Sequence, residues 1–333
     1  MNNRVVKLAL IVTFLIVISS LSFIFSIQWG AVKLSFSEIL NCFGGHCGSA
    51  INESILWQVR IPRALMGFCV GAGLACCGAV LQIATRNPLA DPYLFGIVAG
   101  AGLGVVAATL FFPHIPLQLV PFAAFAGAIS AVLLVIALAR YFFRVEMILL
   151  AGVAIAFMFG AITQLLLYIG EPFASNRIIF WLMGSLSSAN FSQLAVILPL
   201  LFSALIIVLL SHRHLDALML DDDTAQTLGI NVALFRMGLL LGSALITAVI
   251  VAFCGGIGFV GLMLPHIVRF LIGGTSARLL IGCFFFGGIF LMWVDVLARQ
   301  ILPGQEVPIG IITSATGSVF FIGLMLQSKR KLG

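Results

Sequence analysis

The sequence is divided into ten continuous apolar stretches, each about as long as the hydrocarbon core of a bilayer is thick. A helix needs about 20 apolar residues to cross roughly 30 Å of hydrocarbon. Because backbone N–H and C=O groups in hydrocarbon must be bonded within the protein, only helices and closed barrels cross it. The runs are continuous and do not alternate with polar residues, which favours helices over barrel strands. The predicted spans are residues 8–28, 64–84, 93–113, 118–139, 147–169, 193–211, 235–255, 257–273, 279–298 and 309–327.

We therefore predict an all-α, polytopic membrane protein with about ten transmembrane helices in a single domain, residues 1–333. Hydrophobic residues make up 62% of the chain and charged residues 8%, against about 45–50% and 25% in soluble domains. The first apolar run exceeds the roughly 7–15-residue core of a signal peptide, so it is predicted to remain as the first span. Gly255-Gly256 separates the seventh stretch from the eighth. The alternative is that the two stretches form one bent helix.

The distribution of basic residues predicts the orientation. Ten crossings place both termini on the same side, and with the N-terminus in the cytoplasm 12 of the 17 basic residues lie inside. We therefore predict a multi-pass protein of the cytoplasmic (inner) membrane with both termini cytoplasmic. The basic residues are spread between apolar runs and form no stripe, so nucleic acid is not an expected partner. Cys42 and Cys47 lie in a polar external loop, where a local disulfide is compatible with the compartment but left open.

The chain carries no motif for a catalytic or nucleotide site of its own. Residues 256–261 fit G-x-G-x-x-G, but they open a predicted membrane helix and do not follow a strand, and no G-x-x-x-x-G-K-[ST] occurs. We therefore expect no enzyme activity and no bound cofactor or metal in this chain. Carboxylates within the spans are limited to Asp295 and Glu146, near the helix ends, which disfavours an ion-coupled secondary transporter but leaves it as the alternative.

Seven short motifs occur in order over residues 60–327. They are R-x-P-R at 60–63, R-N-P-L-A-D-P at 86–92, L-A-G-V-A at 150–154, A-Q-T-L-G at 225–229, G-F-V-G-L with Pro265-His266 and Arg269, D-x-x-A-R at 295–299 and E-x-P-x-G at 306–310. This series resembles the FecCD-type permeases, the membrane subunits of iron–siderophore, haem and cobalamin ABC importers. The chain departs from that pattern at Gly256, where the family usually has proline, and at Gly317-Ser318-Val319, where it usually has G-A-P.

The resemblance implies a type II ABC importer fold, like that of cobalamin-importer permeases, and a division of labour between subunits. It implies a dimer with a second permease, either a second copy or a related chain. It also implies two cytoplasmic ABC ATPase subunits, which bind ATP and Mg, and a periplasmic or lipid-anchored substrate-binding protein. Membrane lipid surrounds the helices. The pathway is expected along the fifth span, residues 176–186 and the tenth span.

The same resemblance assigns roles to particular residues. Binding-protein docking is expected at Arg60, Arg63 and Arg299, although arginines near helix ends also anchor at the membrane surface. ATPase coupling is expected in segment 212–234, at Asp216, Leu220, Ala225, Leu228 and Gly229, with short helices from about residue 216. The structural motif residues are Arg86, Asn87, Pro88, Asp91, Pro92, Pro265, His266 and Arg269, and the cytoplasmic gate is placed at Val145 and Glu146.

His212-Arg213-His214 stands at the predicted cytoplasmic end of the sixth span, where basic residues typically anchor a helix at the membrane surface. Together these features predict the membrane-spanning permease subunit of a binding-protein-dependent ABC importer. The predicted cargo is a metal chelate, an iron–siderophore first, with haem and cobalamin left open.

Overall fold

The computed structural model describes residues 3–30, 32, 34–139, 145–170, 172–273, 275–302 and 304–330. Over these residues the chain is helical and forms no strand, only an isolated bridge between Leu302 and Gln305. The elements are α1 Asn3–Gln28, α2 Phe36–Phe43, α3 Ala50–Ser54, η1 Ile55–Arg60, α4 Ile61–Thr85, η2 Pro92–Phe95, α5 Ile97–Phe111, η3 Leu117–Leu119, α6 Val120–Ala139, α7 Val145–Ile169, α8 Pro172–Leu182, α9 Phe191–Leu210, α10 His212–Leu220, α11 Asp222–Thr227, α12 Val232–Cys254, α13 Val260–Ile272, α14 Ser276–Ala298 and α15 Ile309–Arg330.

Each of the ten predicted stretches coincides with a helix, namely α1, α4, α5, α6, α7, α9, α12, α13, α14 and α15. Eight helices of the described chain are long and apolar enough to cross a membrane. The other two, α5 and α13, have 15 and 13 residues, so at 1.5 Å per residue they extend only about 20 Å. The number ten is therefore approximate. Helix α13 is short because residues 255–259 run as non-helical backbone, which also separates α12 from α13 and replaces the bent-helix alternative.

Helix α4 is the centre of the bundle. Its apolar window is 89% buried, and the continuous helical run of α3, η1 and α4 extends it outward to Ala50, beyond the predicted start at residue 64. Helix α14 packs along α4 so closely that a Cβ at Gly71 would overlap the carbonyl oxygen of Gly287. Such small residues let two membrane helices approach each other and pack by van der Waals contact.

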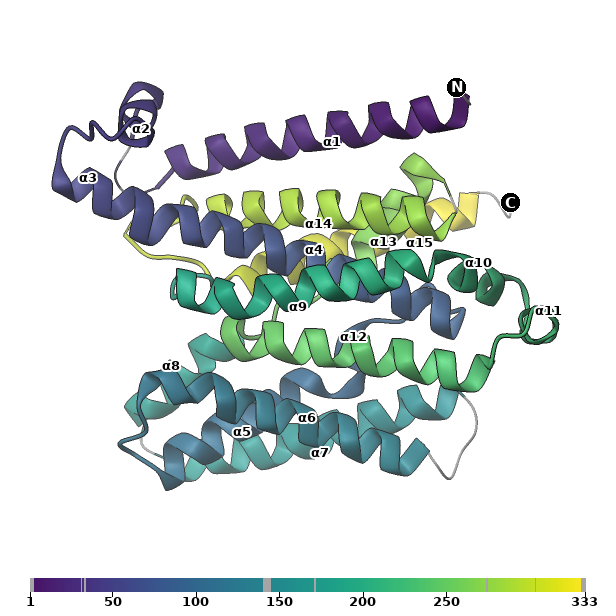
Figure 1. The fold of residues 1–333 in the computed structure, drawn as a ribbon. Coiled ribbons are helices and arrows are strands. Elements are labelled where there is room, and N and C mark those ends of the chain that lie inside the picture. The colour runs from purple at the N-terminus through teal and green to yellow at the C-terminus, as the bar shows by residue number, and fades with distance from the viewer. Residues whose placement is uncertain are drawn as a thin grey trace.

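Figure 1 shows α9, α12 and α14 around α4, with α5, α6 and α7 as a second group below and α1 along the upper edge. Helices α10 and α11 lie at one end of the bundle, together with the start of α1 and the end of α15 (Figure 1). Helices α2, α3 and α8 lie at the other end. We call these the α11 end and the α2 end. Helix α1 begins and helix α15 ends at the same end of the bundle, in agreement with the predicted even number of crossings.

A small disulfide-closed unit forms the tip of the α2 end. Ser35 caps α2, accepting a hydrogen bond from the Glu38 backbone N–H, while its own N–H donates to the Glu38 carboxylate. Cys42 at the end of this helix is joined to Cys47 by a disulfide, which settles the pairing that the sequence left open.

Candidate functional site

A charged network joins three helices at the α2 end. The Arg63 guanidinium on α4 lies 2.9 Å from the Asp295 carboxylate on α14 and 2.8 Å from Glu306, which precedes α15. Arg299 lies 3.1 Å from the same Asp295 carboxylate. Asp295 is only 1% exposed, and a carboxylate this deeply buried is stable as an anion only when it is paired and hydrogen-bonded. The network therefore fixes α4, α14 and α15 relative to one another at the α2 end.

The arginines also complete the end of α1. The last carbonyls of a helix have no partner within the helix. Arg60 donates to the carbonyls of Ile27, Gln28 and Val32, and Arg299 donates to the Trp29 carbonyl at 2.8 Å. A cation is favourable at this end of a helix, because the helix dipole is negative there. Arg60 and Arg299 therefore tie α1 to α4 and α14.

These contacts give the predicted docking arginines an internal role. Arg60 and Arg63 are each 5% exposed and hydrogen-bonded within the chain, so neither presents a free charge to solvent. The exposed member of the network is Glu306, whose side chain is 46% exposed. Partial burial opposes its ionisation, but the hydrogen bonds and charge of Arg63 outweigh this and hold the pKa of Glu306 below its ordinary value. Binding-protein docking through this end stays a prediction.

A second network lies at the α11 end, with Asp222 at its centre. Its carboxylate lies 2.6 Å from the Arg86 guanidinium, at the end of α4, and 2.8 Å from that of Arg236, on the first turns of α12. Arg86 also donates to the Leu218 carbonyl of α10, and Arg236 donates to the Ala84 carbonyl of α4, both at 2.8 Å. Hydrogen bonds from Arg236, with the two positive charges, hold the pKa of Asp222 below its ordinary value. One carboxylate thus connects α11 to α4, α10 and α12.

The predicted structural motif between α4 and α5 forms the turn beside this network. Arg86 takes the left-handed conformation with φ 50°, which ends α4. The Asn87 side chain accepts a hydrogen bond from the Leu89 N–H, while Pro88 lies exposed in the turn. Asp91 accepts from the Tyr93 N–H and caps η2, in which Pro92 is the first residue. Burial raises the pKa of Asp91 to about 6.

The same turn is joined to the second predicted motif, on α13. The Tyr93 hydroxyl accepts a hydrogen bond from the Ile257 N–H at 3.0 Å. Arg269 donates to the Gln82 side chain of α4 at 2.6 Å. Pro265 is buried inside α13, and the His266 ring packs edge-on against Phe320 of α15 at 5.8 Å between centroids. The two motifs, far apart in sequence, therefore hold α4, α13 and α15 together.

The predicted coupling segment forms two short helices, α10 and α11, as expected from the sequence. Asp216 accepts a hydrogen bond from the Ser276 N–H at 2.8 Å, which anchors α10 to the start of α14. Ala225 is fully buried, whereas Leu220 and Leu228 are 66% and 65% exposed. Gly229 closes α11 with φ 82°. Figure 1 shows α11 as the outermost element of this end, and the two exposed leucines lie directly before and after it in the sequence.

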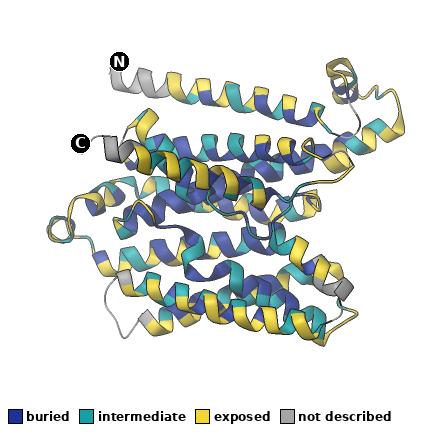
Figure 2. Cartoon of the chain, turned by 180° about the vertical axis from the view of Figure 1, so that it is seen from behind, coloured by how far each residue is buried: buried dark blue, intermediate teal, exposed yellow. Residues whose placement is uncertain are grey.

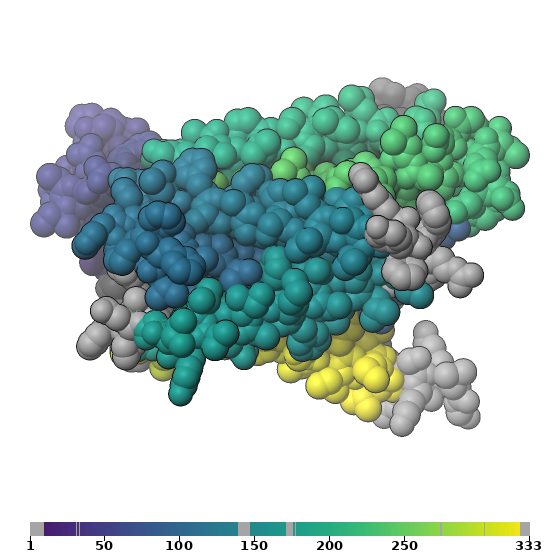
Figure 3. Space-filling model, turned by 90° about the horizontal axis from the view of Figure 1, so that it is seen from below, coloured from purple at the N-terminus to yellow at the C-terminus, as the bar shows by residue number. Residues whose placement is uncertain are grey.

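Two helices predicted to line the pathway are largely uncovered. The apolar windows of α7 and α15 are each only 22% buried. On α7, Phe157 and Tyr168 are 76% and 87% exposed, and on α15, Val319 and Met325 are 71% and 72% exposed. Figure 2 shows α15 with much of its outer surface exposed. Figure 3 shows α15 and α9 on opposite sides of the group formed by α5 to α8.

The other predicted pathway segment, residues 176–186, comprises the end of α8 and the loop that follows it. This loop meets the start of α15, because Ile309 and Gly310 donate backbone hydrogen bonds to Gly184 and Met183, each at 3.0 Å. Helix α7 begins at Val145. The side chains of the predicted gate, Val145 and Glu146, lie outside the described residues.

Sequence reasoning missed the partners that organise these networks. From the sequence Asp222 receives no role, and Asp295 is identified as a carboxylate near a helix end and as part of D-x-x-A-R, without its partners. Arg236 and Gln82 were assigned no role. The sequence does contain a signal for the network at the α2 end. The motifs R-x-P-R, D-x-x-A-R and E-x-P-x-G each carry charged residues next to an apolar span. In hydrocarbon such charges generally pair with one another.

Among the described residues no group of three or more His, Cys, Asp or Glu side chains could hold a metal ion. The free cysteines, Cys69, Cys76, Cys77, Cys254 and Cys283, are all buried.

Comparison with known families matches residues 15–327 to the FecCD transport family. This chain belongs to the FecCD transport family. It is 37% identical over 284 residues to the vitamin B12 import system permease protein BtuC of Salmonella typhi, covering 85% of this chain and 86% of that relative. The BtuC protein of Salmonella arizonae is 36% identical over the same length. The family predicted from the seven motifs is therefore confirmed.

The fold is shared with solved structures. A metal-chelate type ABC transporter in an inward-facing conformation matches with a TM-score of 0.86 at 30% identity, covering 95% of this chain and 99% of the other. PsaBC from Streptococcus pneumoniae, solved with a Fab, matches with a TM-score of 0.57 at 18% identity over 85% of this chain and 94% of that one, and so shares the fold alone. The predicted all-α polytopic permease fold is confirmed, and this FecCD chain is a multi-pass membrane protein.

Proposed function

We propose that this chain is the membrane-spanning permease subunit of an ABC importer that carries a bulky metal chelate into the cell. The observation that carries the proposal is the Asp222 network. Through ion pairs and hydrogen bonds, it connects the short helices α10 and α11 to the central helix α4 and to α12. A transport chain that is driven by a separate motor requires a connection of this kind between the motor's docking surface and the helices that move.

The α11 end faces the cytoplasm in this proposal. It holds Arg86, Arg213, Arg236 and Arg278, and cytoplasmic ends of membrane helices carry an excess of basic residues. The importer has two ABC ATPase subunits, which bind ATP and Mg and perform the hydrolysis. One of them docks on α10 and α11 of this chain, and the other on the second permease. Leu220 and Leu228, on either side of α11, are exposed and supply apolar contact area for the ATPase.

The coupling mechanism follows from the contacts of Asp222. When the ATPase subunits close on nucleotide, they displace α11, and Asp222 carries that displacement to Arg86 at the end of α4 and Arg236 at the start of α12. Asp216 carries it to the start of α14. The bundle thereby switches between outward-facing and inward-facing arrangements, with α7, residues 176–186 and α15 lining the path against a second permease.

The outer binding protein docks at the α2 end. The Arg60, Arg63 and Arg299 contacts hold this end rigid, and Glu306 contributes its partly exposed charge. Charged groups at an interface rim steer docking and fix orientation. Arg63 and Arg299 also neutralise Asp295, so this carboxylate is not free to carry a coupling ion. That pairing argues against the ion-coupled secondary transporter considered from the sequence.

The cargo class is a metal chelate. Relatives that are 36–37% identical are named vitamin B12 import permeases, which supports a cobalamin-type cargo. The sequence favours an iron–siderophore first and allows haem. A transport assay should therefore test both of these chelates beside cobalamin. The exposed apolar side chains of α7 and α15 suit a weakly adhesive tunnel for any of the three.

Cross-linking at the tip of α11 tests the proposed assembly. All five free cysteines are buried, so a single cysteine placed by Leu228→Cys is the selectively reactive thiol. We expect a thiol cross-linker of short span to join this residue to the cognate ATPase subunit in membranes. An Ile51→Cys variant, on α3 at the α2 end and 72% exposed at Ile51, is the control and should give no such product. If the ATPase co-purifies with the permease but cross-links only from position 51, the orientation and the coupling surface are both wrong.

A further inference from the structure

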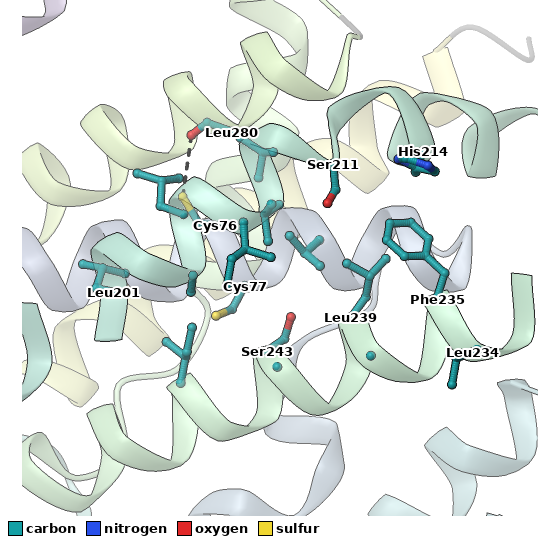
Figure 4. Close-up of a pocket in the computed structure, with 18 of the residues that line it drawn as sticks. Cys76, Cys77, Leu201, Ser211, His214, Leu234, Phe235, Leu239, Ser243 and Leu280 are labelled. Carbon is teal, nitrogen blue, oxygen red and sulfur yellow. Dashed lines mark hydrogen bonds between the residues drawn. The ribbon is translucent and has the colours of Figure 1, made fainter. Parts of the chain in front are cut away.

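A cavity of about 670 Å³ lies between α4, α9 and α12, with its mouth at α10. Figure 4 shows it from the side of α9 and α12, with Leu201 toward one extreme and Ser211 and His214 at the other. This face is opposite to α15 (Figure 3), so the cavity is separate from the proposed pathway.

The length of the cavity matches one leaflet of a bilayer. Its lining runs along α9 from Leu201 to Ser211 and along the α12 side from Asn231 to Ile246. At 1.5 Å per residue these segments extend about 15 and 22 Å, and half of the hydrocarbon core is about 15 Å. The cavity thus begins at the α11 end, and its length of about 15–22 Å is close to the thickness of one leaflet.

The size of the cavity admits a lipid chain. A volume of about 670 Å³ along about 22 Å of helix leaves room for an extended hydrocarbon chain, which needs a cross-section of roughly 20 Å² when its contacts lie at about 4–4.5 Å. The chemistry of the walls and the mouth favours such a chain over a helix of another protein.

The walls and the mouth differ in chemistry. The walls are apolar, and a Cβ built at Gly238 or Gly242 on α12 would meet nothing within 4 Å, so these glycines face open space. The mouth carries Ser211, His214 and Asn231. Beside it Arg213 is exposed and forms no ion pair with any described residue. Basic groups at the cytoplasmic mouth of a site between membrane helices bind anionic lipid headgroups.

We propose that this cavity binds one acyl chain of an acidic phospholipid from the cytoplasmic leaflet, with its phosphate held at Arg213 and His214. Phe235, which packs against the His214 ring at 5.6 Å between centroids, lines the same cavity one residue before Arg236 of the Asp222 network. The bound lipid therefore lies against the coupling segment. The site itself does not depend on which cargo the chain carries.

Native mass spectrometry of the purified full chain tests this site with three probes: phosphatidylglycerol and phosphatidylcholine with 16-carbon chains, and inorganic phosphate. We expect the wild-type chain to retain phosphatidylglycerol over phosphatidylcholine by about fivefold or more, the effect of one basic residue near an anionic headgroup. Inorganic phosphate should not displace the lipid. Equal retention of the two lipids, or displacement by inorganic phosphate, would overturn the proposal.

Two kinds of variant distinguish binding of the acyl chain in the cavity from binding of the lipid headgroup at its mouth. Gly242→Leu fills the open space in the wall and should abolish retention of both lipids. The matched control is Leu245→Phe, which adds bulk on the same helix outside the cavity and should behave as wild type. Arg213→Gln with His214→Gln should remove only the preference for phosphatidylglycerol. Unchanged retention by Gly242→Leu, or an unchanged preference in the double variant, contradicts the assignment.

A measurement on the wild-type chain covers the case in which Gly242→Leu fails to fold. Phosphatidylglycerol with six-carbon chains should be retained at least tenfold less than the 16-carbon lipid, because each CH₂ buried in an apolar cavity adds to binding. Equal retention of the two chain lengths shows that the cavity holds no acyl chain.

Discussion

Asp222→Asn should uncouple ATP hydrolysis from transport while leaving the fold intact. The side chain of Asp222 is 42% exposed, and those of Arg86 and Arg236 are 36% and 18% exposed. Ion pairs that are this accessible to solvent contribute about 0.2–1 kcal/mol each, so the loss of both costs roughly 0.4–2 kcal/mol. A membrane domain with the usual 5–15 kcal/mol of stability tolerates that loss.

The functional effect should be larger than the loss of stability. Coupling free energies between sites are typically about 1–3 kcal/mol, or five- to 150-fold, and Asp222 is the direct side-chain link from α11 to both α4 and α12. We expect the amount of chelate carried per ATP hydrolysed to fall by about tenfold. The assay measures both quantities in one preparation of vesicles containing the permease and its ATPase.

The neighbouring acid provides a matched control. Asp223 is exposed and has no ion-pair partner among the described residues, so Asp223→Asn removes the same charge without breaking the network. It should leave the transport-to-hydrolysis ratio unchanged. A ratio that falls equally in both variants, or in neither, refutes the role given to the Asp222 network.

Three further outcomes follow from the contacts. Asp295→Asn breaks a fully buried pair and should lower the free energy of unfolding by about 3–5 kcal/mol, seen as a large fall in the melting temperature of the detergent-solubilised chain. Gly71→Val should destabilise the chain by at least about 1–3 kcal/mol, because its Cβ overlaps the Gly287 carbonyl; Gly323→Val, at a glycine with nothing within 4 Å, should melt like wild type. The pKa of Asp222 is lowered in the folded chain, so ionised Asp222 stabilises the fold. This contribution is fully present above the ordinary aspartate pKa of about 3.9 and is lost only as pH falls through the lower folded value. Hydrogen exchange of α11, corrected for its intrinsic pH dependence, should therefore show equal protection at pH 7.5 and pH 5, and a loss of protection at pH 5 contradicts this.

The helices were predictable because hydrocarbon imposes length and polarity on every segment that crosses it. The stretches predicted at 93–113 and 257–273 were drawn too long, since the chain there is held in non-helical form by tertiary contacts. The Tyr93 hydroxyl, for example, binds the Ile257 N–H. Such a contact joins positions 164 residues apart, and no local pattern in a single sequence reveals it.

The charged residues were harder to interpret than the apolar ones. The positions of Arg60 and Arg63 beside a span were evident, and from position alone they resembled free docking charges. Their burial becomes visible only with their partners: Arg63 pairs with Asp295 and Glu306, more than 230 residues away, and Arg60 donates to carbonyls at the end of α1. At the opposite end, the short helices α10 and α11 were predicted, but the use of Asp222 as their link to the core required the structure.

ATP-driven uptake in vesicles tests the central claim most directly. The permease, its ATPase and the binding protein are reconstituted, and vesicles loaded with ATP are offered labelled cobalamin, an iron–siderophore and haem in parallel. We predict accumulation of one of these chelates that requires the ATPase and ATP and is unaffected by ionophores that collapse ion gradients. Uptake that persists without the ATPase, or that disappears with the ion gradient while ATP is present, would contradict the assignment of this chain as an ABC importer permease.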